Sequence, residues 1–587
     1  MSDVQTQFVH SLRRKLLSLR DDSTGVWTGE LSSSALSTAL ALVALMGEQS
    51  EEQLLSSAQW LQKHQNEDGG WGDTPTSQSN ISTTLIARAA LCTVQKKYGA
   101  IDFQVVLQRA TDWVVIRTGG MEFPRLVQAL SQIYKKDRTF AIPILTFIAI
   151  CENDDRVWPT IPSLPFILAL LPQSLYRFFR IQVVSYALPA LIAIGLCRSS
   201  CAAASHKLPS WWKIVAPPLL RKLEKLQPLH GGFLDAIPLT AFVAIALTKI
   251  GYTSHPVVGR AKAFLKQSYR PDGSYAIDTN LRTWVTSLTT RALLNTEEGT
   301  DDFPLHEKRR LAHWIIERQQ KHVHPYTGAQ PGGWAWTDCA GGVPDADDTS
   351  AALIALYHLQ QHGVTLNMFK DIRAGIQWLM GLQNHDGGMP TFCKGWGRLP
   401  FDRSCPDISA HALLACVLWR EQCEIEEDKL NRLLAYLKSQ QKKDGSWFPL
   451  WFGHQEAEGC CNPVVGTARV VDALQQVIKN GYTAFGVTEI LSLGISWILH
   501  QQHVDGSWGA GPQGTNEETA LAVIALKGQE KISAQRAVRQ GCLWLIKQGL
   551  DPKPAPIGLY FSLLWYTEKM YPLTWTLEAL AGNITYE

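Results

Sequence analysis

Two kinds of helical segment alternate along most of the chain. The first is amphipathic, as in residues 58–65, with apolar side chains at the three- and four-residue spacing of an α-helix. The second is apolar and rich in small residues, as in residues 80–91 and 463–474, which suits a helix buried on all sides. Strand-like alternation is almost absent. The pattern predicts an all-α protein in which outer amphipathic helices surround inner apolar ones, as in an α/α-toroid.

A short motif recurs at the end of the amphipathic segments: a Gln, three residues, a Gly, one residue and an aromatic. Gln65, Gly69 and Trp71 form one copy. Gly can take the left-handed conformation that ends a helix, so we expect each motif to staple a turn to its neighbour. Further copies end at Phe233, Tyr275, Trp334, Met389, Trp447 and Trp508, and from Tyr275 onward they lie 55 to 61 residues apart, enough for two helices and their loops.

The repeats predict two α/α-toroid domains. The first barrel is expected over residues 21–270. The second is expected over residues 271–587, joined by an N-terminal helix at residues 1–20.

Composition narrows the function classes. The 55 Lys+Arg and 53 Asp+Glu residues give a net charge of +2, which argues against nucleic acid as a partner. Hydrophobic residues make up 45% of the chain, too many for a disordered protein. Twelve Cys residues are too sparse for a disulfide scaffold, whereas 21 Trp residues are unusually many.

The sequence contains no run of 18 apolar residues uninterrupted by polar residues or proline, so it predicts no transmembrane helix. Residues 162–180 nevertheless mix aromatic and aliphatic side chains with Arg177 and Arg180, and residues 181–197 carry no charge. Such a segment suits the lipid headgroup region. We therefore expect the first barrel to attach to one face of a membrane, on the cytoplasmic side. A buried helical hairpin is the alternative interpretation.

Three carboxylates are crowded at the start of one apolar inner segment. Asp345, Asp347 and Asp348 follow Pro344, and the apolar run begins at Ala351. If buried, three such groups cannot all stay ionised, so one is expected to be neutral at neutral pH and able to act as a general acid. The alternative is an ordinary cluster of acidic caps at a helix N-terminus.

A second inner segment offers a partner for these carboxylates. Asp407 and His411 lie four residues apart and so on one face of a helix. A cationic imidazole facing the acidic cluster could hold and polarise one carboxyl group. The alternative is a histidine satisfied within the core.

These residues resemble a known family. The run DADDTS resembles the DxDDTA motif of class II terpene cyclases, and the repeats resemble the QW motifs of squalene-hopene cyclases, over nearly the whole chain. The resemblance implies an apolar cavity between the two barrels and a catalytic role for Asp347 as proton donor to a terminal isoprene double bond. His411 would raise its acidity, while Asp345, Asp348 and Asp407 would anchor the network and return the proton from water.

The resemblance also implies a lining of aromatic rings that stabilise carbocations without capturing them. For any one ring the alternative is a place in the core. The residues that fall at such positions are Trp284, Trp336, Phe392, Trp451, Phe561, Trp565 and Tyr571.

The favoured function is cyclisation of squalene to a hopene-type triterpene. Val465, where a Tyr usually precedes the Gly-Thr pair, and Met389 depart from the family pattern, so a prenylated aromatic or another polyprenyl substrate stays open. An α/α-toroid glycosidase and a non-enzymatic scaffold are the alternatives from other classes. No metal and no cofactor are expected, and a homodimer is left open.

Overall fold

The computed structural model describes residues 3–99, 102–134, 138–171, 188–205, 212–295, 302–325, 327–365, 369–392, 402–483, 486–559 and 563–581. By its contacts the chain divides into two compact units. Unit 1 comprises residues 1–30, 280–338 and 343–587, and unit 2 comprises residues 31–279 and 339–342. The predicted boundary at residue 270 therefore lies nine residues before the one in the structure, and the N-terminal helix belongs to unit 1.

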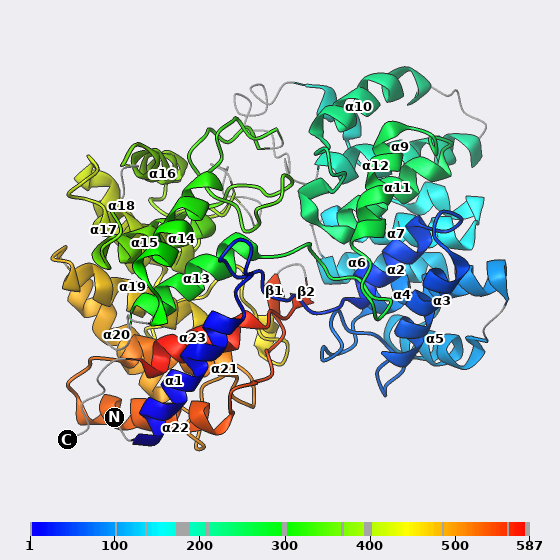
Figure 1. Cartoon of the computed structure of the whole chain (residues 1–587). Coiled ribbons are helices and arrows are strands. Elements are labelled where there is room, and N and C mark those ends of the chain that lie inside the picture. The colour runs from blue at the N-terminus through cyan, green and yellow to red at the C-terminus, as the bar shows by residue number, and fades with distance from the viewer. Residues whose placement is uncertain are drawn as a thin grey trace. The chain divides into compact units, whose positions relative to one another are not determined.

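Unit 1 contains a closed ring of six inner helices. Each helix packs against the next, and the last returns to the first. Burial on all sides explains why these segments are apolar and rich in small residues; every residue of α17, for example, is buried. In order, the inner helices are α13 (Arg282–Leu294), α15 (Ala346–Gln361), α17 (Pro406–Leu418), α19 (Pro463–Lys479), α21 (Asn516–Leu526) and α23 (Met570–Leu580) (Figure 1).

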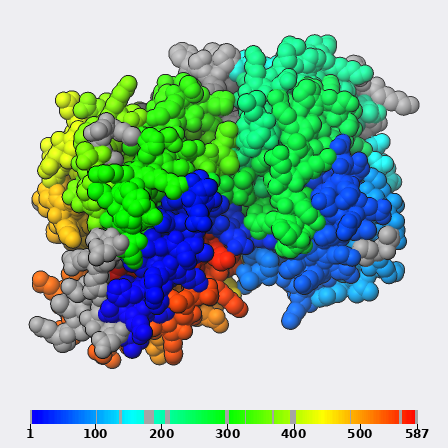
Figure 2. Space-filling view, viewed as in Figure 1, coloured from blue at the N-terminus to red at the C-terminus, as the bar shows by residue number. Residues whose placement is uncertain are grey.

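Amphipathic helices form the outer layer of unit 1, each packed against one or two inner helices. The N-terminal helix α1 (Asp3–Ser18) packs on α23 and so supplies an outer helix from the opposite end of the chain; in the space-filling view the blue N-terminal segment lies beside orange and red C-terminal residues (Figure 2). The remaining outer helices are α14 (Leu305–Glu317), α16 (Phe369–Leu382), α18 (Glu427–Gln440), α20 (Val487–His500) and α22 (Ile532–Lys547).

The repeated motif joins each outer helix to its neighbours through hydrogen bonds. The Gln441 side-chain amide donates to the carbonyl of Gly445 at 3.0 Å and to that of Ile490, in the first turn of α20, at 2.9 Å. Gly445 has φ +97°, and a Cβ there would lie 2.5 Å from the Leu493 carbonyl oxygen. The Gln and the Gly together therefore hold the turn after α18 against α20.

The aromatic residue of the motif ties the same turn to the inner layer. The Trp447 indole N–H donates to the Leu437 carbonyl at 2.8 Å, and the Trp447 backbone N–H donates to Thr467 Oγ1 in α19 at 3.0 Å. Equivalent amide bonds are made by Gln65, Gln227, Gln319, Gln383 and Gln502.

One copy of the repeat was missed in the sequence. The Trp27 indole N–H donates to the Leu16 carbonyl at 2.7 Å, and its backbone N–H donates to Thr286 Oγ1 at 3.2 Å. These contacts are equivalent to those of Trp447. They join the outer helix α1 to the inner helix α13.

Unit 2 has the same two-layer construction. Its inner helices α2 (Ala35–Ala44), α4 (Ile81–Tyr98), α7 (Arg138–Glu152), α9 (Leu188–Ser205) and α11 (Ile237–Lys249) pack in that order, and α11 returns to α2. The other α-helices described in it are α3 (Glu51–Lys63), α5 (Gln104–Thr118), α6 (Phe123–Tyr134), α10 (Trp212–Leu226) and α12 (Pro256–Gln267), with 3₁₀ turns at Asp155–Thr160, Phe166–Leu170 and Phe233–Asp235.

Much of the segment expected to face a membrane, residues 172–187, lies outside the described residues. In the part before it, Ile167, Leu170 and Leu171 are exposed. Within the described ranges, no helix is both long enough and apolar enough to cross a bilayer.

The all-α prediction holds in its coarser form, because the fold is mostly helical and of the α/α-toroid kind, but it needs a correction near the C-terminus. Strands β1 (Ile557–Leu559) and β2 (Leu564–Tyr566) form a small antiparallel sheet in which Ile557 lies opposite Tyr566. Three prolines within residues 552–556 precede it. Proline lacks the N–H that a helix interior needs, so this stretch cannot continue as a helix.

Candidate active site

The acidic motif begins helix α15, and its first member is a helix cap. Asp345 Oδ1 accepts the backbone N–H of Asp348 at 2.8 Å, and the Asp345 N–H donates to the Trp334 carbonyl at 3.0 Å. The capping interpretation is thus correct for Asp345. It does not account for Asp347, whose side chain makes its contacts with other helices.

Asp347 is bound by two side chains from two neighbouring inner helices. His411 Nδ1, on α17, lies 2.6 Å from Asp347 Oδ1. Arg469 Nη2, on α19, lies 2.7 Å from Oδ1 and 3.0 Å from Oδ2. The side chain of Asp347 is 16% exposed. The predicted pairing of His411 with the acidic motif is therefore present.

Arg469 also reaches the other predicted acidic residue. Its Nη1 lies 2.9 Å from Asp407 Oδ2, and the Asp407 side chain is 1% exposed. The Cys405 thiol donates to Asp407 Oδ1 at 2.5 Å and accepts the Leu450 backbone N–H at 3.1 Å. Asp347, Asp407 and His411 thus form one buried network around Arg469.

Sequence reasoning missed Arg469. The signal was its place in residues 463–474, where a charged side chain interrupts an apolar inner segment. A buried guanidinium requires an acidic partner, and the two nearest acidic motifs supply one each.

The electrostatics distinguish the three carboxyls, of which the sequence predicted one to be neutral without saying which. Burial by itself would raise the pKa of Asp347, but the charge of Arg469 and the hydrogen bond from His411 bring that pKa well below its usual range. Burial raises the pKa of Asp345 to about 7 and the pKa of Asp348 well above its usual range. The charge of Asp347 adds to both effects, whereas the hydrogen bond from Asp348 lowers the pKa of Asp345. At neutral pH the proton of the motif therefore resides mainly on Asp348, which shares a hydrogen bond with Asp345, and Asp347 is ionised.

A second correction concerns the cation. Burial lowers the pKa of His411, against the opposing influence of Asp347, so at neutral pH His411 is a neutral donor to Asp347. The positive charge predicted for the imidazole is carried by Arg469, whose pKa is raised by Asp347 and Asp407 despite the opposing effect of burial.

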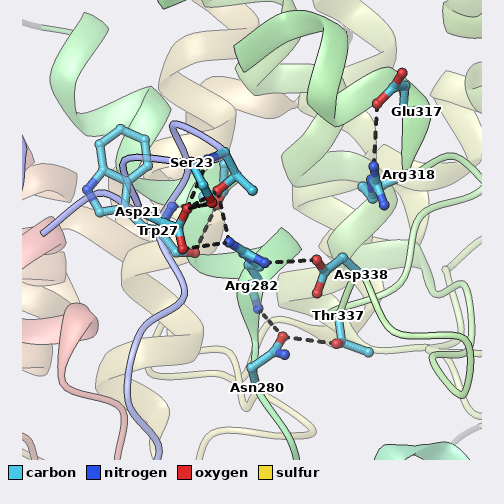
Figure 3. Close-up of polar contacts among 11 residues, drawn as sticks. Asp21, Ser23, Trp27, Asn280, Arg282, Glu317, Arg318, Thr337 and Asp338 are labelled. Carbon is cyan, nitrogen blue, oxygen red and sulfur yellow. Dashed lines mark hydrogen bonds and ion pairs between the residues drawn. The ribbon is translucent and has the colours of Figure 1, made fainter. Parts of the chain in front are cut away.

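Loop contacts hold the N-terminal ends of successive inner helices together. The backbone N–H groups of Thr283 and Trp284 both donate to the Trp336 carbonyl, at 2.9 and 3.1 Å. Arg282 fixes this corner through ion pairs with Asp338 at 3.2 Å and Asp21 at 3.4 Å (Figure 3). The predicted aromatics Trp284 and Trp336 are thereby neighbours although 52 positions separate them.

Three predicted aromatics form a continuous row. The ring of Phe392 lies between Trp336, with centroids 6.0 Å apart, and Trp451, with centroids 5.7 Å apart. The Trp451 indole N–H donates to Thr391 Oγ1 at 3.0 Å. Three loops carry this row, before α15, α17 and α19, and the one before α17 is joined to the acidic motif, since the Ala346 N–H donates to the Thr391 carbonyl.

A second aromatic group surrounds the guanidinium. Arg469 Cζ lies 5.9 Å from the Trp284 ring and 5.5 Å from the Phe452 ring. Phe452, which sequence reasoning passed over in favour of Trp451, contacts Tyr571 at 6.3 Å between centroids. Tyr571 is thus part of the site. Trp565 is buried in β2, and Phe561 lies outside the described residues.

A small polar cavity of about 40 Å³ lies inside the ring of unit 1, next to His411 and Arg469. Its far side is formed by Arg291, which pairs with Asp472 at 2.5 Å and with Glu578 at 2.7 Å. Because one water needs about 10–15 Å³, this cavity has room for about three or four waters and none for a polyprenoid.

Comparisons with known proteins identify the family of this chain. Residues 9–148 match the squalene-hopene cyclase N-terminal domain, and residues 282–553 match the squalene-hopene cyclase C-terminal domain. The chain is 24% identical to the enfumafungin synthase efuA of Hormonema carpetanum over 88% of this chain and 43% of that one. It is 26% identical to the squalene–hopene cyclase of Bradyrhizobium diazoefficiens over 57% and 52% of the two chains.

These matches span about half the length of those two relatives. The squalene–hopene cyclase of Zymomonas mobilis is 23% identical over 98% of this chain and 95% of its own. Among solved structures, the ent-copalyl diphosphate synthase from Streptomyces platensis has the same fold, with a TM-score of 0.55 and 17% identity over 99% of each chain. The two matched domains cover most of the sequence, and the chain belongs to the squalene-hopene cyclase family of class II terpene cyclases.

Proposed function

We propose that this protein protonates the terminal double bond of a linear polyprenoid with Asp347 and drives a cationic cyclisation. The observation that carries the proposal is the largely buried carboxyl of Asp347, held at 2.6–3.0 Å by His411 and Arg469 beside aromatic rings. Family membership sets aside the glycosidase and scaffold alternatives.

The chemistry accounts for these residue types. An isolated alkene is a very weak base, so its proton must come from a strong acid, as the next double bond attacks. A folded chain held in place makes that attack effectively unimolecular. Developing positive charge is stabilised by aromatic faces, about 0.5–2 kcal/mol for each, whereas water would capture the cation. The row Trp336–Phe392–Trp451 is suited to this task.

Reloading of Asp347 is assigned to its neighbours in the same motif. The side chains of Asp345 and Asp348 are hydrogen-bonded to each other, and burial raises the pKa of both carboxyls. Asp348 Oδ1 is buried with no partner among the described residues, so it is free to accept or pass on a proton. We propose that this pair returns the proton that Asp347 donates.

The proposed substrate is squalene, and the proposed product a hopene-type triterpene. The alignment with the Zymomonas mobilis squalene–hopene cyclase over nearly both full chains supports this choice. A prenylated aromatic is the second candidate, because Val465, buried in the first turn of α19, brings no ring to the site. The substrate cavity between the two barrels stays a prediction.

We also propose that unit 2 attaches to one face of a membrane, from which a polyprenoid could enter. The exposed apolar side chains of Ile167, Leu170, Leu171 and Ile214 support this proposal.

The test is incubation of the purified protein with squalene and, separately, with a farnesylated or geranylgeranylated phenol, followed by mass spectrometry of the extracts. We expect a cyclised product with the wild-type protein and none with Asp347→Asn. His411→Ala should reduce the rate about 10- to 100-fold, the worth of one hydrogen bond to a charged group.

The matched control is Asp444→Asn, in a repeat turn where Asp444 accepts the Trp497 indole N–H, and it should cyclise at the wild-type rate. Full activity in Asp347→Asn would refute the assigned acid. Absence of product from every polyprenoid with folded wild-type protein would refute the function.

A further inference from the structure

Arg469 contacts the proposed proton donor more extensively than His411 does. Its Nη2 lies within hydrogen-bonding distance of both oxygens of Asp347, while Nη1 bonds Asp407. One guanidinium from α19 therefore joins a carboxyl on α15 to another on α17. This fork geometry is available to arginine and not to the point charge of a lysine.

The surroundings hold the guanidinium in this position. It lies near the rings of Trp284 and Phe452, and its side chain is 11% exposed. On the far side, Asp407 is fixed by the Cys405 thiol. Rotation of Arg469 away from the site would leave two buried carboxyls without their cation, which is strongly unfavourable.

We propose that Arg469 is a positioning residue that stabilises the carboxylate of Asp347 after proton transfer and thereby sets the strength of that acid. The inference rests on the proposed function, in which Asp347 is the donor. The resemblance implied that His411 raises the acidity of Asp347, and the inference gives this role to Arg469 as well.

The proton balance shows where the charge acts. The O–H bond of Asp347 breaks and its electron pair stays on the oxygen. The π pair of the terminal double bond forms the new C–H bond, and the neighbouring tertiary carbon becomes positive. Negative charge thus appears on an oxygen already bound by Arg469, so the stabilisation requires no reorganisation at the moment of transfer.

The contact with Arg469 makes Asp347 a stronger acid but lowers the fraction of Asp347 that carries a proton. A carboxyl beside an arginine has a pKa about 1–3 units lower than one without it, so it is a stronger acid but carries its proton less often at a given pH. Removing the charge should weaken the acid and raise its loaded fraction at higher pH. Among the described residues, the charged or titratable groups near Asp347 and Arg469 include Asp345, Asp348, Asp407, His411, Cys405, Asp472, Glu578 and Arg291, and all are retained when Arg469 alone is changed.

The experiment measures kcat and KM of Arg469→Met and Arg469→Lys on the polyprenoid that the wild-type protein turns over, starting at the lowest pH at which each protein stays folded. The acid range decides the outcome, because the loaded fractions of wild type and variant diverge only between the low wild-type pKa of Asp347 and its higher pKa in the variant. For Arg469→Met the ratio of its kcat to the wild-type kcat should be lowest at acid pH. That ratio should rise by up to about 10-fold per pH unit, over a total of about 10- to 1,000-fold. Arg469→Lys should show a smaller rise because it keeps the charge, and KM should change little in either variant.

Arg13→Met is the matched control. It removes a buried arginine of α1, in the outer layer of unit 1, that pairs with Asp302 at 2.8 Å and donates to the Leu293 carbonyl. We expect it to lower thermal stability and to leave a kcat ratio that does not vary with pH. A pH-independent ratio for Arg469→Met or, if that variant does not fold, for Arg469→Lys would overturn the inference, as would the same pH dependence in Arg13→Met.

A second readout separates this inference from the proposed function. If the wild-type protein turns over no polyprenoid, the function fails, but the carboxyl stretch of Asp347 can still be titrated by infrared difference spectroscopy against Asp347→Asn. We expect Asp347 to take up its proton at a lower pH in the wild-type protein than in Arg469→Lys or Arg469→Met. Equal titration in all three proteins would refute the role of Arg469.

Discussion

Replacing Gln441 by Ala tests whether the repeated motif holds the toroid together. The Gln441 amide joins the turn after α18 to the first turn of α20 through the carbonyls of Gly445 and Ile490. Each such bond contributes about 0.5–1.5 kcal/mol net, so the two together should contribute about 1–3 kcal/mol. In a unit of this size the loss should lower the Tm of unit 1 by about 2–6 °C.

Differential scanning calorimetry measures this change, and the adjacent residue provides the control. Gln440 is the same amino acid one position earlier, but its side chain is exposed and donates only to Ser439 Oγ at 3.3 Å. Gln440→Ala should therefore change the stability by less than about 0.5 kcal/mol. Equal Tm values for the two variants would show that the amide bridge does not stabilise the repeat.

Two further predictions concern buried groups of unit 1. Glu517 is 1% exposed, and burial raises its pKa to about 8. Because the folded protein binds this proton more tightly than the unfolded chain does, the contribution of Glu517 to stability should fall as pH rises from about 4 to about 8. Glu517→Gln avoids this loss, and the Tm gap in its favour should widen over that range; a constant gap would contradict the assignment. Phe452→Leu removes a ring 5.5 Å from Arg469, and kcat in the product assay should fall about 2- to 30-fold with little change in KM, whereas a rise in KM at constant kcat would indicate a binding role.

Much of the helical architecture could be predicted because the repeat is local. A Gly with positive φ and an amide that bonds a carbonyl four residues later act within a few positions, so their spacing locates each turn. The copy at Trp27 was missed for the same reason. Asp21 stands four residues before Gly25, where other copies have Gln, and the remaining contacts of Trp27 are with α1 and α13, which are distant in sequence.

The aromatic assignments show where spacing stops being informative. Trp336, Phe392 and Trp451 are neighbours as the resemblance implied, because each lies in a loop that leads into an inner helix. Phe452 and Trp451 are adjacent, and only the direction of the backbone after Leu450 decides which ring faces Arg469. The sequence contains no local signal for that choice.

The charge state of the site was the least predictable property. Counting carboxylates in one motif correctly indicated that some must hold protons, but the choice among them depends on a cation 122 positions away. Arg469 selects Asp347 as the ionised member, which leaves the raised pKa values on Asp345 and Asp348. Which carboxyl is protonated therefore depends on its distance to Arg469 in the folded protein, and not on how closely the carboxyls follow one another in the sequence.

This order of protonation bears on how the proposed enzyme could combine two opposed requirements. Donating a proton to an alkene requires a strong acid, and a strong acid is seldom loaded at neutral pH. In this site the stabilising cation contacts Asp347, while the raised pKa values belong to neighbours in the same helical turn. Acid strength and proton storage are thus placed on different carboxyls. A single aspartate in an apolar pocket could not supply both, because the burial that would keep it protonated would also make it a weak acid.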